Sequence, residues 1–424
     1  MDISAVLSEF KGLSYRAWVL MIGLFVSVIV SYLGHQGLAL WSSVLGLLLI
    51  TDWRHFKSFS WVLGVMALSL LWILCRTNPY DFTHPKGDDH TGWLKILCES
   101  LFYVPVFLAA TQLSSAQAFK LISLVKWACL GLGLVLAYET ASNAALFRAI
   151  CWQFHSDIRP DLAMVKVSVS SYYLMLLYWP LMLVAQLMSQ KRILLFLSAI
   201  LIIVPIIMSA NAVTLALVIS ALTFWVAKLW PKTWIGIEKI IAAKIGLIVL
   251  LWPLLIAWLH KGGIMDKYAT HLPDSWAERV HIWDTTSVKM FDKFIMGQGF
   301  DFSRVWSDIP LHPHNMSFQA VLELGFVGLI LLAGFWVCVI LRTGQATTIF
   351  HFVRHSDESQ LMNIDIKIDT KPYFLATAVC YFTFAFISFG MWQEWFLAMA
   401  ALSTCVCLVA SKALDEAILS QYQL

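Results

Sequence analysis

Charged residues are scarce in this chain of 424 residues: only 13% are Asp, Glu, Lys or Arg, whereas soluble domains carry about 25%. Hydrophobic residues make up 60% of the sequence, and the mean hydropathy is +0.75. The formal net charge of +3 is too small for a strongly basic nucleic-acid-binding protein. These values exclude soluble globular, disordered and fibrous classes, and they indicate a polytopic membrane protein.

Metal-binding and nucleotide-binding motifs are also missing from the sequence. Its eight cysteines include no Cys-x-x-Cys pair, so a disulfide or metal framework is not expected. There is neither a Walker loop nor a Gly-x-Gly-x-x-Gly sequence. Asp88 and Asp89 could bind a divalent ion, but the neighbouring Gly87 and His90 favour a solvated turn. We therefore expect no metal and no cofactor.

Long apolar runs are what the sequence does contain. A helix needs about 20 mostly apolar residues to cross the bilayer core, and lipid requires each spanning segment to satisfy its own backbone hydrogen bonds. About twelve such runs predict an all-α transmembrane protein that forms a single domain over residues 1–424. They lie near 17–33, 38–50, 59–75, 93–111, 120–139, 168–187, 193–208, 211–229, 240–259, 315–341, 373–389 and 393–411.

Lys and Arg determine the predicted orientation, because cytoplasmic loops are enriched in them. If the N-terminus is inside, the inner segments, such as 51–58 and 230–239, contain more of the 29 Lys and Arg than the outer segments. Half of the outer ones lie in one long loop, which counts little in this rule. We expect an N-in and C-in protein whose first apolar run is a retained span, since no cleavage site follows it.

The loop of residues 260–313, between the ninth and tenth spans, is the longest segment that is not predicted to cross the membrane. Ser275 and Glu278 have the spacing of a capping box, which predicts a helix start, and Gly297 and Gly299 predict its end. One face is apolar, so we expect an amphipathic helix that lies on the outer leaflet or covers a membrane cavity. That face would contain Trp276, Val280, Trp283, Met290, Phe291 and Phe294.

His312 and His314 come after this helix, at the junction between the loop and the outer end of the tenth span. An imidazole can accept a proton near neutral pH, so His314 is a candidate base. Arg279 and Arg304 are cations of the same loop. Arg279 lies at the border between the polar and apolar faces, where its guanidinium can reach a lipid phosphate; snorkelling to head groups is the alternative.

A spaced pattern begins at this point: His314-Asn315 is followed after nine residues by Gly325 and after two more by Gly328. This pattern resembles the motif of bacterial O-antigen ligases. The sequence is similar to this family, and to the wider superfamily that includes O-antigen polymerases, in its span count and its large outer loop. The resemblance covers roughly residues 150–390.

Further points of resemblance are Arg279-x3-Trp283 and an outer Arg before a span, Arg159. One departure concerns the turn between the seventh and eighth spans, where family members often carry an Arg. This chain has Ser209-Ala210-Asn211-Ala212 at that turn, so another cation would have to replace the missing one.

The resemblance implies a GT-C-like enzyme of the bacterial inner membrane with its active site facing the periplasm. It implies transfer of O-antigen polysaccharide from undecaprenyl pyrophosphate to a sugar hydroxyl of lipid A-core, without metal or ATP. The expected partners are these two lipid-linked glycans and membrane lipids, with no nucleic acid. The loop of residues 260–313 would be periplasmic.

The chemistry of this reaction suggests roles for the candidate residues. His314 would act as general base in an inverting displacement. Arg279 would bind the donor pyrophosphate, because a planar guanidinium matches phosphate oxygens. A second set would supply further donor-binding cations: Arg304, Arg159 and Lys166. A third set would bind or orient the acceptor: His312, Asn315 and Trp283. Among these, Trp283 is expected to stack against a sugar ring.

Two other functions stay open from the sequence. An O-antigen polymerase of the same superfamily would use another lipid-linked glycan as acceptor. A lipid-linked oligosaccharide flippase would place ionisable residues near the bilayer midplane, whereas here most of them gather at the outer face. Glu323 lies within the tenth span, on the helical face opposite His314, and we expect it to make a helix–helix hydrogen bond.

Overall fold

The computed structural model describes residues 12–77, 92–231, 233–344, 347–355 and 361–422. Its elements in chain order are α2 (Tyr15–Leu33), α3 (Gly37–Leu48), η1 (Ile50–Phe59), α4 (Ser60–Arg76), α5 (Gly92–Ala110), α6 (Ser115–Ser142), α7 (Ala145–Gln153), α8 (Pro160–Leu187), α9 (Lys191–Ile207), α10 (Asn211–Leu229), α11 (Ile237–Lys261), α12 (Ile264–Ala269), α13 (Asp274–Lys289), η2 (Met290–Lys293), α14 (Phe302–Val305), α15 (Met316–Thr343), β1 (Thr347–His355), β2 (Leu361–Asp369), α16 (Lys371–Ile387), α17 (Glu394–Lys412) and α18 (Leu414–Tyr422).

The prediction of an all-α polytopic membrane protein is confirmed. Each of the twelve predicted runs coincides with a helix. Within the described residues, nine helices are long and apolar enough to cross a membrane, and α3 and α16 are shorter apolar helices. Apolar side chains of these helices interlock in one large core that includes Tyr173, Phe318 and Phe396.

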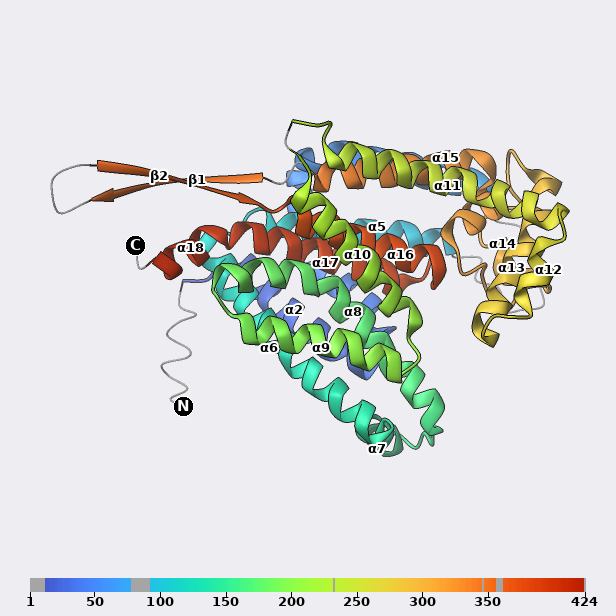
Figure 1. Ribbon diagram of the computed structural model, residues 1–424, viewed down its shortest axis with the longest axis horizontal. Coiled ribbons are helices and arrows are strands. Elements are labelled where there is room, and N and C mark those ends of the chain that lie inside the picture. Colours follow the sequence, from blue (N-terminus) through green and yellow to red (C-terminus); the bar gives the residue numbers. More distant parts are fainter. Residues whose placement is uncertain (1–11, 78–91, 232, 345–346, 356–360, 423–424) are drawn as a thin grey trace.

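One β-hairpin departs from the predicted helical pattern. Strands β1 and β2 pair antiparallel, from Thr347 opposite Asp369 to His355 opposite Leu361. Alternation of Ile364, Ile366 and Ile368 with polar residues is the pattern that could have predicted a strand here. The hairpin extends away from the helical bundle (Figure 1).

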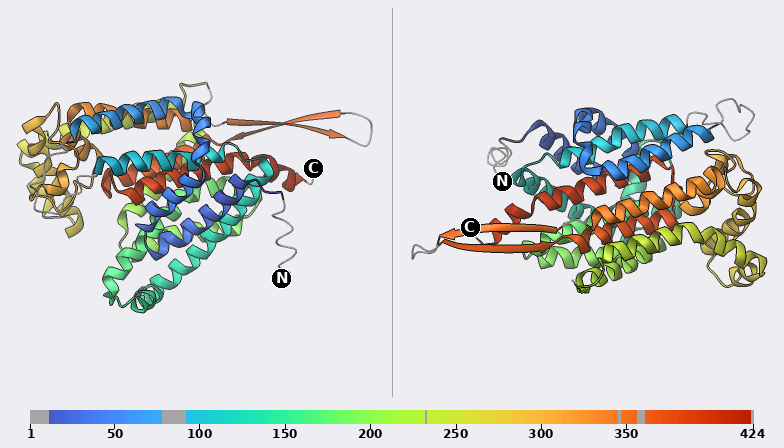
Figure 2. Two further views of the ribbon diagram at one scale, coloured as in Figure 1. Left: turned by 180° about the vertical axis from the view of Figure 1, so that it is seen from behind. Right: turned by 90° about the horizontal axis from the view of Figure 1, so that it is seen from above.

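The bundle has two distinct ends. Helices α12, α13 and α14 gather at one end, which we call the site side, while the hairpin and α18 lie at the other, the terminal side (Figures 1 and 2). Hydrogen bonds join Ser14 to Gln117 and Ser115 to Asp415 on the terminal side. The first and last parts of the described chain therefore lie on the same side, as N-in and C-in topology requires.

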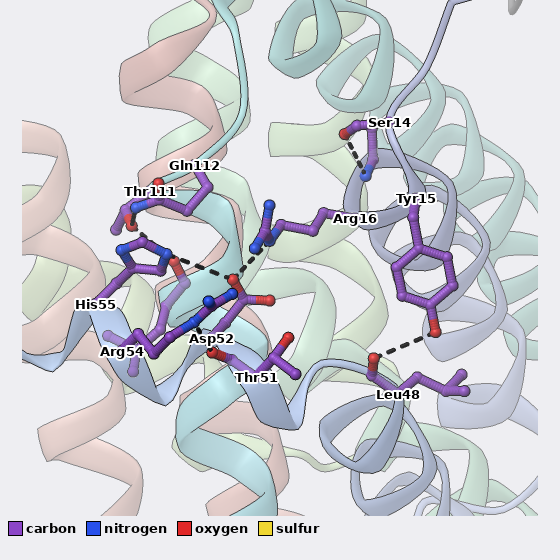
Figure 3. A network of polar contacts seen from close by, with 12 residues as sticks. Ser14, Tyr15, Arg16, Leu48, Thr51, Asp52, Arg54, His55, Thr111 and Gln112 are labelled. Carbon is purple, nitrogen blue, oxygen red and sulfur yellow. Dashed lines mark hydrogen bonds and ion pairs between the residues drawn. The ribbon is translucent and has the colours of Figure 1, made fainter.

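A polar network stabilises the terminal side (Figure 3). The Asp52 side chain is only 1% exposed, and its carboxylate accepts a hydrogen bond of 2.6 Å from Arg16 Nε. His55 Nε2 lies 3.8 Å from the same oxygen. A buried carboxylate is costly without such partners, so this network ties the start of α2 to η1.

Helix α15 is interrupted at Gly325, where φ is 72° and ψ is −170°. The preceding loop fills the interruption: Gln298 and Gly299 donate backbone hydrogen bonds to the carbonyls of Leu322 and Glu323. A Cβ on Gly325 would lie 2.2 Å from the Ile295 carbonyl oxygen. Only glycine fits this close approach, and the predicted single helix of 315–341 is therefore divided at Gly325.

Candidate active site

The candidate site lies where α13, α15 and α16 meet on the site side. The predicted capping box at the start of α13 is wrong, because Asp274 is the first residue of the helix and no side chain caps it. Pro273, in an extended conformation with ψ 147°, directs the chain into the helix. Ser275 therefore lies inside the first turn.

The predicted amphipathic helix exists, but it is shorter and differently rotated than expected. It ends at Lys289 and continues as the 3-10 helix η2, before the glycines that were expected to end it. Trp283 and Met290 are buried, whereas Phe291 is 50% exposed. Packing against α11 and α15 determines which face is buried.

The carboxyl end of α16 organises the site. The last carbonyls of a helix have no partner within the helix, and here three consecutive ones accept side chains from distant segments. Phe386 accepts Asn315 Nδ2 at 2.8 Å, Ile387 accepts Arg279 Nε at 3.1 Å, and Ser388 accepts His314 Nδ1 at 2.7 Å. One helix end therefore brings the candidate base and the first candidate cation together.

The Ser388 contact determines which nitrogen of His314 can act. Because a carbonyl only accepts, His314 Nδ1 carries the ring proton and Nε2 keeps its lone pair. Burial lowers the pKa of His314, and the Arg279 charge lowers it further, while the bond to Ser388 opposes both. The imidazole is therefore neutral at neutral pH, which is the form a general base requires.

His314 has a φ of 52°, in the left-handed region that residues other than glycine rarely adopt. Asn315 follows it as the N-cap of α15, and its side-chain oxygen accepts the backbone N–H groups of Ser317 and Phe318 at 2.9 and 3.1 Å. The same side chain donates to Phe386. Asn315 thus connects α15 to α16 and orients His314.

Trp283 supports the site from behind. Its Nε1 donates a hydrogen bond of 2.8 Å to the Pro313 carbonyl, directly before His314. The indole packs against Trp252 and Phe318 and is 6% exposed. No ring face is open to a substrate, so the predicted sugar stacking of Trp283 is wrong, and the residue orients the His314 segment.

Among the described residues, Arg279 contacts neutral groups only. Besides Ile387, its guanidinium donates a 2.6 Å hydrogen bond from Nη1 to the Ser275 carbonyl and lies 5.7 Å from the centre of the Trp276 ring. Within the described residues, its Nη2 has no hydrogen-bond partner. The guanidinium is thus fixed in direction without being neutralised by a carboxylate, and it can still bind an anion.

His312 lies beside His314, with their ring centres 4.2 Å apart. Its Nδ1 accepts the backbone N–H of His314 at 3.2 Å, so its proton must be on Nε2, which lies 3.2 Å from the Gln393 carboxamide. Burial, His314 and then the two arginines Arg304 and Arg279 lower the pKa of His312 to about 3. This ring is neutral and positions its neighbour.

Asp301 is a further residue of the site that was not among those predicted from the sequence. Its φ is 64°, and its carboxylate lies 3.2 Å from Arg304 Nε. Burial and the Glu323 carboxylate raise the pKa of Asp301 to about 7, against the opposing charges of Arg304 and Lys95. The i,i+3 spacing of Asp301 and Arg304 is the pattern that could have indicated this pair.

Glu323 makes the hydrogen bonds that its place in a span requires. Its carboxylate accepts Ser303 Oγ from α14, Gln319 Nε2 from α15 and Trp392 Nε1 from the segment before α17. The prediction that Glu323 bonds between elements is confirmed. In addition, it fixes three residues around the site, which sequence spacing did not indicate.

One predicted donor contact, Arg159, lies apart from this group. Arg159 is 73% exposed and pairs with Asp161 at 2.5 Å, just before α8. That end of α8 lies beside α7, well separated from α12–α14 (Figure 1). Lys166 is exposed, and its charge acts on His35 of the α2–α3 connection. The structure therefore brings together His314, His312, Asn315, Arg279, Trp283 and Arg304, whereas Arg159 pairs with Asp161.

The part of the chain that the structure describes contains no group of three or more His, Cys, Asp or Glu arranged to bind a metal ion. The candidate acidic pair of Asp88 and Asp89 lies outside the described residues.

Comparison with known proteins supports the motif. Residues 181–333 match the family model described as O-antigen ligase. This range contains His314, Arg279 and Arg304 but excludes Arg159 and Lys166. The resemblance predicted from the motif is confirmed for residues 181–333, which are similar to the O-antigen ligase family.

Similar proteins occur in Rickettsia. One from Rickettsia conorii, named "Putative polysaccharide ligase RC0486", is 27% identical over 175 residues, or 38% of each chain. One from Rickettsia bellii, named "Putative polysaccharide ligase", is 27% identical over 164 residues, or 35% of each chain. The chain thus spans less than two fifths of the length of these curated relatives. No solved structure matches it. These matches show similarity to polysaccharide ligases over the shared segments.

Proposed function

We propose that this protein is an O-antigen ligase that transfers polysaccharide from undecaprenyl pyrophosphate to a sugar hydroxyl of lipid A-core. The observation that carries the proposal is the end of α16. There, the Ser388 carbonyl leaves His314 Nε2 unprotonated, and the adjacent Ile387 carbonyl directs an unneutralised Arg279 into the same place.

The proposed reaction is a single displacement. The acceptor hydroxyl oxygen forms a bond to the anomeric carbon of the donor, while the bond from that carbon to the pyrophosphate oxygen breaks. The hydroxyl proton passes to His314 Nε2, and the electron pair of the broken bond leaves on pyrophosphate. Arg279 Nη2 stabilises the developing charge. Attack from the face opposite the leaving group inverts the anomeric centre.

No metal or ATP enters this scheme, because the glycosyl pyrophosphate is already activated and a guanidinium can stabilise the leaving group. The proposed location is the bacterial inner membrane, with both termini inside and the site side in the periplasm. Arg159 pairs with Asp161 in this arrangement, so we assign it no contact with the phosphate that Arg279 binds.

Reconstitution tests the proposal. The purified protein is placed in vesicles with undecaprenyl-pyrophosphate-linked glycan and lipid A-core, in the presence of a chelator. We expect glycan on lipid A-core. Glycan that lengthens on the carrier instead would identify the polymerase alternative, and movement of the carrier across the vesicle without transfer would identify a flippase. Activity only after divalent ions are added would contradict the metal-independent mechanism.

A further inference from the structure

A polar pocket lies next to His312, on the side of the α14 segment. It has a volume of about 190 Å³, and the lining residues that matter here are Asp301, Arg304, His312, Gln319, Trp392 and Gln393. At about 30 Å³ for each water molecule in the liquid, this volume equals about six waters. That is room for one sugar ring and too little for a lipid chain.

The chemistry of this lining suits a saccharide. A sugar presents hydroxyls that both donate and accept, with apolar C–H groups on its ring faces. The pocket offers a carboxylate, a guanidinium, an imidazole and two carboxamides, which together supply donors and acceptors. The Trp392 indole adds a flat apolar surface. A small number of polar groups placed around an aromatic side chain is typical of a site that binds a specific small ligand.

Unused hydrogen-bonding capacity remains in the lining. Gln393 contacts His312 with one end of its carboxamide, whereas the other end is buried without a hydrogen-bond partner among the described residues. A buried polar atom without a partner costs about 1–3 kcal/mol. A ligand hydroxyl would supply what this carboxamide lacks.

The pocket is held in shape before any ligand arrives. The buried Glu323 carboxylate accepts hydrogen bonds from Gln319 and Trp392, two of the lining residues, and from Ser303 beside Arg304. Asp301 adopts a left-handed backbone conformation that residues other than glycine rarely have. Strained conformations of this kind persist where the surrounding structure imposes them, often at ligand sites.

We propose that this pocket binds the acceptor saccharide, with Asp301 and Gln393 on its hydroxyls and Trp392 against its ring face. This inference rests on the proposed function. It places the acceptor beside His312 and His314, separate from the Arg279 contacts that face the donor. It also reassigns Arg304, which pairs with Asp301 in this pocket, from the donor to the acceptor.

The variants Asp301→Asn and Gln393→Leu test this assignment in the full-length protein. Loss of one hydrogen bond of about 1.4 kcal/mol changes a binding constant tenfold. We therefore expect each variant to raise the KM for lipid A-core, and the Kd of lipid A-core measured without donor, by about tenfold. The KM for the undecaprenyl-linked donor should not change. Gln393→Leu decides the question if Asp301→Asn fails to fold.

Asp308→Asn is the matched control, because Asp308 is exposed on the same segment and contacts only Ser307 among the described residues. It should leave both KM values unchanged. An unaltered Kd for lipid A-core in Gln393→Leu would overturn the pocket assignment, as would a rise in donor KM alone. The binding measurement needs no transfer, so a wild-type protein that binds lipid A-core here yet transfers nothing would contradict only the proposed function.

Discussion

Two groups of side chains, one on each side of the bundle, are held in different ways, although Arg304 on the site side also pairs with a carboxylate. On the terminal side, cations meet carboxylates: Arg16 lies 2.6 Å from Asp52, and Lys371 lies 2.9 Å from Glu238. On the site side, Arg279 and His314 meet the backbone carbonyls of α16. A carbonyl dipole directs a donor without cancelling its charge. The first arrangement joins helices, and the second leaves a charge and a lone pair available to a substrate.

Removing the base should have the largest effect. We expect His314→Gln to lower the rate of glycan transfer by about 10²–10⁴-fold, the usual contribution of a general base. The initial rate in reconstituted vesicles measures this. His55→Gln on the terminal side is the matched control and should transfer normally. A His314→Gln protein with at least half of the wild-type rate would exclude the role of base.

Replacing the site-side guanidinium should come next. Arg279→Lys keeps the charge but loses the planar group that can contact Ile387 and a phosphate at the same time. We therefore expect transfer to be about 10²-fold slower, which is the effect of losing one hydrogen-bond donor to the transition state. The same rate assay measures it, and Arg16→Lys provides the comparison on the terminal side. Equal effects of the two substitutions on transfer would contradict the contrast between the two ends.

The pH dependence should be smaller but more specific. Protonation of His314 removes the lone pair, so transfer falls as the pH drops through the folded-state pKa. Burial and Arg279 lower that pKa below its ordinary value in the free enzyme, so the acid limb of kcat/KM, which reports the free enzyme, should lie below about pH 6.5. Arg279→Gln removes the charge that lowers the pKa of His314. The residual activity of this variant should therefore show the acid limb at higher pH. A limb above pH 7 in the wild type would contradict the assignment.

The terminal-side pair should affect transfer least. Asp52→Asn removes the charge partner of Arg16 and leaves a buried amide, at a cost of about 1–3 kcal/mol in unfolding free energy. The melting temperature in detergent should fall, while kcat at a permissive temperature should stay at the wild-type value. A large loss of kcat in a protein that remains folded would show that this network also serves catalysis.

The helices follow from the sequence because lipid imposes a local condition: each span must be apolar and must satisfy its own backbone. Hydropathy therefore located all twelve runs. Predictions from local sequence patterns were wrong where residues elsewhere in the chain determine the structure. Ser275 and Glu278 have capping-box spacing, yet Pro273 already directs the chain into α13. Trp283 has a large aromatic ring of the kind that stacks against sugars, yet Trp252 and Phe318 pack against it.

The candidate site was only partly predictable. His314, Arg279 and His312 could be identified from the motif and the loop, whereas Asp301, Gln393 and the α16 carbonyls could not. Arg279 and Ile387 are 108 residues apart in the chain, and His314 and Ser388 are 74 apart. No local pattern states that such groups will meet.

The sequence by itself determined a membrane-spanning helical protein with an O-antigen ligase motif, because hydropathy and motif spacing are properties of single segments. Tertiary structure alone decided the proton position on His314 and the unneutralised charge of Arg279. The reason is physical: a tautomer and a free charge depend on which acceptor lies within hydrogen-bond distance. That acceptor is the end of α16, which reaches the motif only when the helices pack together.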